Sequence, residues 1–357
     1  MKTAIRSAIL GVFCAAVSVL AQTNDIDLRR RSFEPAAGAP PLLNRFSVSY
    51  RLGFNLHADF KNLGGYVPVK SPGPDSGGGV DRYYDDGFDR VDISTNAGGL
   101  TWYWGYSRTN QLSGDGTVLM SGSSSSAGAA SKGVSDDPSQ GFELTYRGQI
   151  AAADNWRWGI EAAFGYLEFH VHDGRALLAD VSRTSDAYAL NGVIPPVAPY
   201  TGTFGGPGAL ISDSPGRSFR MIPNGASITG PRSLDASIYS FRLGPYLEIP
   251  LAQKLSLNLS GGVVLVDVDG DFRFQETVTI LDTGASATTI GAGSRSEWLV
   301  GGFVAADLSV PLSESWSIFA GIQYQSAGRY SQTLKGKRAE LDLGETIFLT
   351  IGLGFSF

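Results

Sequence analysis

The sequence predicts an all-β fold, a transmembrane antiparallel up-and-down barrel of about ten strands. Three observations indicate it. The last twelve residues (TIFLTIGLGFSF) alternate between large apolar and small or polar side chains. The same alternation recurs in segments from Arg45 onward. The mean hydropathy is only -0.01, as expected when lipid-facing and lumen-facing side chains alternate along every strand and their hydropathies cancel.

The N-terminus predicts export. Lys2 and Arg6 precede an apolar run over residues 8–20, and Val19-Leu20-Ala21 offers a cleavage site. These features are typical of a signal peptide, which we place at residues 1–21, and imply Sec-type export. The run is too short for a transmembrane helix. Cys14, the only cysteine, would leave with the signal, so the mature chain could form neither a disulfide nor a thiolate metal site.

Residues 22–44 show no apolar period. They contain two aspartates, the triplet Arg29 to Arg31 and Pro40-Pro41. We therefore interpret this stretch as a periplasmic lead-in, followed by the barrel over residues 45–357.

The first strand is expected over residues 45–59, with apolar side chains at even positions and polar ones at odd positions. A weaker strand is expected over 88–94, then a turn at 96–99. An aromatic strand over 100–106 follows. All three would cross the membrane.

The remaining strands are more regular. We expect a hairpin of 142–150 with 156–166, and then strands over 239–251, 255–265, 298–310, 316–324 and 346–357. Bacterial single-chain barrels have even strand numbers, short periplasmic turns and long outer loops. A total of about ten fits this rule, and eight or twelve stay open. The longest outer loop would be about 174–234, and we expect it to lie partly over the barrel opening.

Aromatic residues near the strand ends fit the same orientation. Trp156, Trp158 and Trp316 follow predicted periplasmic turns, and Trp298 begins a strand that comes from outside. Amphipathic rings of this kind form the girdles at the two membrane interfaces.

The C-terminus carries a family resemblance. The chain ends on Phe357, preceded in alternation by Leu353 and Phe355. This ending resembles the C-terminal strand signal of Gram-negative outer-membrane β-barrel proteins. The resemblance implies that these three residues are read by the barrel assembly machinery and that the protein resides in the cell outer membrane, in contact with lipid and lipopolysaccharide.

The alternation also predicts a set of charged side chains that line the lumen. Both signs are present, so the set could form a salt-bridged polar core or a mixed-charge, water-filled constriction. The residues are Arg45, Arg51, Asp59, Arg90, Asp92, Glu143, Arg147, Arg157, Glu161, Arg242 and Glu248.

No catalytic, metal or cofactor site is predicted. His170, His172 and Asp173 would lie at the outer rim, where His and Asp resemble the omptin-type outer-membrane proteases, but no omptin motif matches residue by residue. Two histidines are too few ligands for a metal. The Asp267, Asp269 and Asp271 series lacks the glycine and glutamate positions of a calcium loop.

Function follows from the class only in part. A formal net charge of -6 argues against nucleic acid as a partner. A narrow porin-like channel for small solutes or ions is our first hypothesis. The alternative is a structural or surface-interaction barrel that acts through its extracellular loops, and an omptin-like rim protease comes third. We expect the protein not to be an enzyme.

Overall fold

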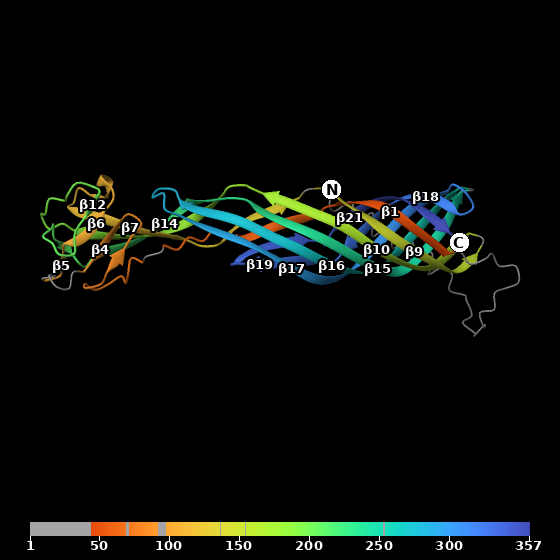
Figure 1. The fold of residues 1–357 in the computed structure, drawn as a ribbon, viewed down its shortest axis with the longest axis horizontal. Coiled ribbons are helices and arrows are strands. Elements are labelled where there is room, and N and C mark those ends of the chain that lie inside the picture. Colours follow the sequence, from red (N-terminus) through yellow and green to blue (C-terminus); the bar gives the residue numbers. More distant parts are fainter. Residues whose placement is uncertain (1–43, 69–70, 92–97, 136, 154, 253) are drawn as a thin grey trace.

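A computed structural model describes residues 44–357 except 69–70, 92–97, 136, 154 and 253. The predicted signal peptide and all but the last residue of the lead-in therefore lie outside the described residues. The molecule is elongated, with a ring of strands at one end and a group of short strands at the other (Figure 1).

Within the described residues, eight antiparallel strands form a closed ring, because each pairs with its chain neighbour and the last returns to the first. The ring strands are β1 (Asn44–Phe54), β9 (Ser139–Ala153), β10 (Trp156–Asp173), β15 (Arg232–Ala252), β16 (Leu255–Ile280), β17 (Ser286–Pro311), β18 (Trp316–Ser326) and β21 (Thr346–Ser356). The seam lies between β1 and β21, in register from Arg45 opposite Ser356 to Phe54 opposite Ile347. The expected up-and-down barrel is thus present with eight strands.

The ring has eight strands, one of the numbers left open beside about ten, because two of the predicted strands leave the ring. The segments at 88–94 and 100–106 supply β4 (Gly87–Arg90), β5 (Leu100–Thr101) and β6 (Tyr103–Tyr106), which belong to small separate sheets. These strands are shorter than the roughly 9–11 residues that cross a bilayer. Without these two predicted strands, the number of ring strands is still even.

The ring continues outward in a second, water-exposed section that we call the stalk. Four strands continue β1, β9, β18 and β21 beyond short breaks and form one sheet in the order β19-β20-β2-β8. In the chain, β2 and β19 come after β1 and β18, whereas β8 and β20 come before β9 and β21. They are β2 (His57–Leu63), β8 (Ala129–Val134), β19 (Arg329–Leu334) and β20 (Lys337–Asp342). On the other side, β10, β15, β16 and β17 run from the barrel into the stalk without a break (Figure 1).

Side-chain facing inverts between barrel and stalk. On β1, Ser47, Ser49 and Arg51 point inward and are buried, whereas beyond the break Leu56 and Ala58 are the fully buried residues. Odd-numbered residues therefore face inward before the break, and even-numbered residues face inward after it. The backbone accomplishes this at Asn55, whose φ is +64°, in the left-handed region that Asn tolerates better than most residues.

Along the unbroken strands the same positions keep facing inward, and the residue type at those positions changes from charged to apolar. The inward residues of β10 change from Arg157 and Glu161 to Leu167, Phe169 and Val171. A barrel in lipid needs an apolar exterior, and a barrel in water needs an apolar interior. The switch therefore separates a section with the side-chain distribution expected in lipid from one with the distribution expected in water. Above it, an apolar core that includes Phe60 stacked on Phe272, with ring centroids 5.9 Å apart, fills the stalk.

The outer connections extend the stalk further. The connection 174–231 contributes β11 (Leu177–Ala189) and β14 (Gly216–Thr229), which extend the sheet beyond β16 in the order β16-β14-β11-β7, ending at β7 (Thr117–Ser125). The segment predicted as a lid over the opening is therefore part of the extension, because its backbone finds partners in the sheet. The longest connection between ring strands is 55–138, not 174–234.

At the far end the remaining strands form what we call the head. It contains β3 (Arg82–Tyr83), β4, β5, β6, β12 (Tyr200–Thr201), β13 (Ile211–Ser212) and the one-turn helix η1 (Thr109–Gln111). Its core is aromatic and includes Trp104, Tyr106 and Tyr188. Among the described residues, no helix is long and apolar enough to cross a membrane.

Candidate functional site

The barrel interior is occupied by a connected set of ion pairs. Glu143 accepts a hydrogen bond from Arg242 at 2.6 Å and forms an ion pair with Arg51 at 3.0 Å. Glu161 accepts a hydrogen bond from Arg147 at 2.7 Å and forms an ion pair with Arg242 at 3.3 Å. All five side chains are nearly inaccessible to solvent, so each charge depends on its partners for solvation.

Two further contacts extend this set. Arg147 also reaches Asp307 at 2.7 Å, which carries the network across to β17. Nearer the turns, Glu248 lies 3.4 Å from Arg45 and 3.6 Å from Arg157. The cavity left between the central residues is about 10 Å³, room for roughly one water molecule.

The structure separates the predicted lumen residues into three groups. Arg45, Arg51, Glu143, Arg147, Arg157, Glu161, Arg242 and Glu248 lie inside the ring. Asp59 and Arg90 were assigned to the lumen wrongly: Asp59 lies on β2 in the stalk, where the facing has inverted, and Arg90 lies on β4 in the head. Asp92 lies outside the described residues.

Asp307 was missed although its strand was predicted. It alternates with Ala305 and Ser309 on the inward face of β17, and the period-2 pattern of residues 298–310 contains that information. Only the three-dimensional arrangement identifies its partner.

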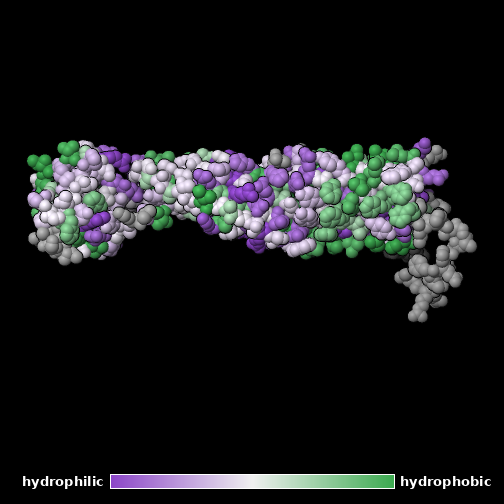
Figure 2. Space-filling view, viewed as in Figure 1, coloured by the Kyte–Doolittle hydropathy of each residue, from purple (hydrophilic) through white to green (hydrophobic). Residues whose placement is uncertain are grey.

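The outer face of the barrel is apolar. Leu243, Val263 and Val300 are 54%, 60% and 75% exposed on adjoining strands. Figure 2 shows hydrophobic side chains gathered over the barrel end of the face in view, and we call this region the belt. Tyr166 and Tyr239 form one edge of this belt, with ring centroids 5.3 Å apart.

The residues of the predicted assembly signal lie on this outer face at the turn end. Leu353, Phe355 and Phe357 are 48%, 38% and 61% exposed. Phe355 contacts the ring of Trp316 at a centroid distance of 5.1 Å. The backbone of Phe357 exchanges two hydrogen bonds with Asn44, at 2.9 and 3.1 Å, so the final residue also closes the seam.

The rim histidine lies outside the stalk and faces solvent. His170 is 3.2 Å from Asp235 and 3.7 Å from Glu168, and its side chain is 61% exposed. The imidazole of His170 therefore points away from the barrel opening. Within the described ranges, no three His, Cys, Asp or Glu side chains could together hold a metal ion.

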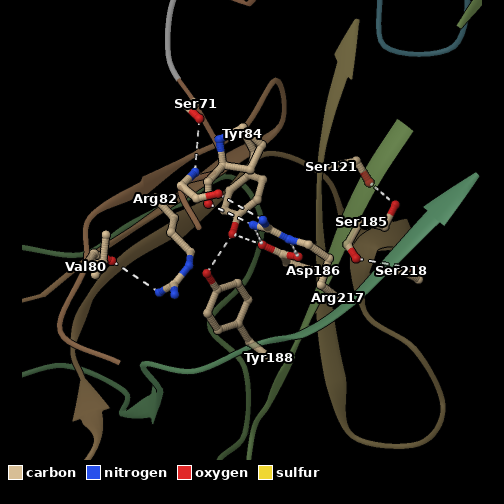
Figure 3. Close-up of polar contacts among 12 residues, drawn as sticks. Ser71, Val80, Arg82, Tyr84, Ser121, Ser185, Asp186, Tyr188, Arg217 and Ser218 are labelled. Atoms are coloured by element: carbon tan, nitrogen blue, oxygen red, sulfur yellow. Dashed lines mark hydrogen bonds and ion pairs between the residues drawn. The ribbon is translucent and has the colours of Figure 1, made fainter. Parts of the chain in front are cut away.

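A buried polar cluster joins the head to the stalk (Figure 3). The Tyr84 hydroxyl donates to Asp186 at 2.5 Å and lies 2.7 Å from the Tyr188 hydroxyl. Arg217 donates to both oxygens of Asp186, at 2.7 and 2.6 Å, and to the carbonyl of Gly73 at 2.9 Å. Burial is the largest effect that raises the pKa of the Tyr84 and Tyr188 hydroxyls, so both stay protonated and can donate.

A second buried charge lies beside this cluster. Asp89 is fully buried, and neither of its oxygens has a hydrogen-bond partner. Burial raises the pKa of Asp89 to about 7, against the attraction of Arg82 and with the repulsion of Asp213. Arg82 itself donates to three backbone carbonyls, those of Gly77, Val80 and Asp213. Sequence reasoning missed both clusters, because their members come from separate connections between ring strands.

No family model and no curated protein matches the sequence. Among solved structures, the chain is similar to Ail, the attachment invasion locus protein of Yersinia pestis, at 12% identity and a TM-score of 0.30, covering 89% of this chain and 100% of that one. It is similar to the outer membrane protease OmpT of Escherichia coli at 8% identity and a TM-score of 0.32, covering 91% and 100%. The toluene transporter TodX of P. putida has 8% identity and a TM-score of 0.17, covering 89% and 91%.

These similarities are too distant to transfer a function. The fold expected from the sequence, an antiparallel β-barrel with an apolar outer face, is confirmed, since the strands close into a ring whose exposed side chains are apolar.

Proposed function

We propose that the protein is a closed outer-membrane barrel that anchors a rigid extracellular stalk and head, whose surface binds a partner. This is the surface-interaction alternative of the sequence analysis. The filled interior supports it best: ion pairs cross the barrel, and two small cavities of about 10 Å³ each lie among them.

The stalk closes the remaining path. Above the ion pairs, the interior consists of buried apolar side chains from both sides of the ring, with Phe60, Phe169 and Phe272 fully buried. Water and ions are excluded from such a core. A channel would need this core to move as well as the charged network, so the porin-like hypothesis is the weaker one.

The outer surface supports a binding role. The head exposes large apolar side chains that a partner could cover, including Ile194, Val197 and Phe204 at 89%, 88% and 59%. The long strands hold this surface away from the belt (Figure 1). In this proposal, lipid surrounds the belt, lipopolysaccharide lies around its outer edge, and the assembly machinery reads the terminal strand.

A conductance measurement tests the proposal. The refolded full chain, inserted into planar bilayers, should show no stable single-channel steps, and vesicles that contain it should retain a small entrapped solute. A porin inserted by the same procedure serves as the positive control, and heat-modifiable migration shows that the barrel is folded. Regular conductance steps from the folded protein would overturn the proposal in favour of the channel.

A further inference from the structure

The first half of β14 is an open sheet edge. Residues Gly216 to Ile222 pair with β11 on one side. On the other side, β16 pairs only with residues 226–229 of β14, because β16 ends at Ile280. Among the described residues, the nearest backbone bond on that side runs from Leu281 N to Gly225 O at 2.9 Å. On this side, the stretch 216–222 therefore presents backbone groups that pair with none of the described strands.

Other edges of the same sheet are protected. On β7, Ser121 O accepts the backbone N–H of Asp85 at 2.9 Å. On the outer half of β17, the carbonyl of Arg295 accepts the Tyr330 hydroxyl at 2.9 Å, and that of Gly293 accepts Gln332 at 2.7 Å. Proteins commonly block exposed edges in such ways, because an unblocked edge pairs with other chains.

The side chains of the open edge alternate in character. Phe219 and Met221 share one face and are 69% and 63% exposed. Arg220 points to the other face and is exposed as well. Pro215 and Pro223 flank the stretch and have no N–H to donate to a partner strand, so strand pairing is confined to the seven residues between them.

The charge on this edge is uncompensated. Arg220 lies directly opposite Arg183 of β11, and like charges in that position repel. Arg183 has an ion pair with Asp282. Arg220 has no acidic side chain within ion-pair distance in the part of the chain that the structure describes. A strand added beside β14 could place a carboxylate next to it.

We propose that β14 binds an extended segment of a partner protein by strand addition, with an acidic side chain beside Arg220 and apolar side chains against Phe219 and Met221. Main-chain hydrogen bonds supply affinity in this mode, and alternate side chains supply specificity. A second copy of this chain is the poorer occupant, since its own β14 would bring another Arg220 and no carboxylate. The inference rests on the proposed binding role and names the surface and the partner chemistry.

Two synthetic peptides test it: Thr-Val-Glu-Val-Glu-Val-Thr and the same peptide with Lys in place of both Glu. The detergent-solubilised full chain should bind the Glu peptide more tightly, and hydrogen exchange at residues 216–222 should slow when it binds. Arg220→Glu should reverse the preference, changing the affinity ratio roughly fivefold or more. The double variant Phe219→Ser, Met221→Ser should weaken both peptides, whereas Leu312→Ser in the turn between β17 and β18, a matched change at a side chain that is 62% exposed, should not.

Three outcomes would overturn the inference: no slowing of exchange at 216–222, an unchanged preference in Arg220→Glu, or sedimentation that shows a dimer whose β14 edge is protected without peptide. The last would assign the edge to a second copy. Because conductance is measured separately, a closed barrel that binds neither peptide would refute this inference and leave the proposed function standing.

Discussion

Arg147 Nη2 lies 2.7 Å from Asp307 Oδ2, and this contact joins opposite walls of the barrel. Arg147 is on β9 and Asp307 is on β17, four strands apart in either direction around the ring of eight. An ion pair between neighbouring strands leaves a lumen open, whereas one across the diameter closes it. The barrel interior is therefore a polar core in which an ion pair connects opposite walls.

Breaking this crossing should be costly. Asp307→Ala leaves Arg147 buried with only Glu161 as a partner, and removing one member of a buried pair costs on the order of 3–5 kcal/mol. A urea titration of the refolded protein in lipid vesicles measures the loss. The double variant Arg147→Met, Asp307→Leu removes both charges and should lose less. An unchanged midpoint for Asp307→Ala would contradict the burial of the pair.

The apolar belt gives a second test. Leu243 faces outward on β15 and is 54% exposed, so Leu243→Arg should cost about 2–4 kcal/mol if its depth is near the middle of the bilayer. Ser237 lies on the same face of the same strand, beyond Tyr239 and outside the belt. Ser237→Arg should therefore cost little in the same titration. Equal losses for the two variants would place the membrane boundary elsewhere.

The sequence predicts the barrel half well because lipid imposes a strict rule on it. Strands such as 142–150 and 346–357 must alternate apolar and polar residues, and a period of two is readable in a single sequence. The facing of residues such as Glu143 and Arg242 follows from the same period.

The stalk and head are harder to predict from the sequence, because strands outside lipid need not alternate apolar and polar residues in the same way. Asp59 continues the odd-numbered pattern of the first strand, yet Asn55 exchanges the faces just before it. Arg90 and Tyr103 alternate as in a barrel strand, but their strands β4 and β6 pair with each other, and β6 also pairs with β12 far along the chain. The partner of Arg147 and the cluster around Asp186 also depend on contacts between distant segments, which one sequence does not reveal.

Asp89 predicts a pH dependence of the head. Its pKa is about 7 in the folded protein, raised by burial, against an ordinary value of 3.8. The folded state therefore holds the proton more tightly, and stability should fall as the pH rises from about 4 to 7 and level off above. Limited proteolysis of the head at pH 5 and pH 8 should show faster cleavage at pH 8. Asp89→Asn should remove most of that difference, whereas the exposed control Asp75→Asn should retain it. A full pH difference in Asp89→Asn would exclude Asp89 as the cause.

Phe357 closes the seam through its backbone and carries an exposed aromatic ring that we expect to act in assembly, and variants can separate the two. Deleting it removes an exposed aromatic side chain and the two backbone bonds to Asn44 that close the seam. Phe357→Ser retains the backbone bonds and removes only the ring. If the ring is the assembly signal, both variants should be exported and yet be depleted from the outer-membrane fraction to a similar extent. Depletion of the deletion alone would show that seam closure, and not the aromatic ring, is what matters.

Asn55 should be the residue on which the exchange of faces depends. Its φ of +64° costs roughly 1–2 kcal/mol for a residue with a branched Cβ. Its Nδ2 also donates to Glu345 O across the break at 2.7 Å. Asn55→Gly keeps the backbone conformation and loses one hydrogen bond, so it should be mild. Asn55→Val loses both and should lower the urea midpoint clearly more. Hydrogen exchange should show the added loss in β2, where Leu56 and Ala58 must face inward, rather than in β1. Equal effects of Gly and Val would mean that the strand can turn its faces over without this residue, and that the apolar stalk core alone determines where the barrel ends.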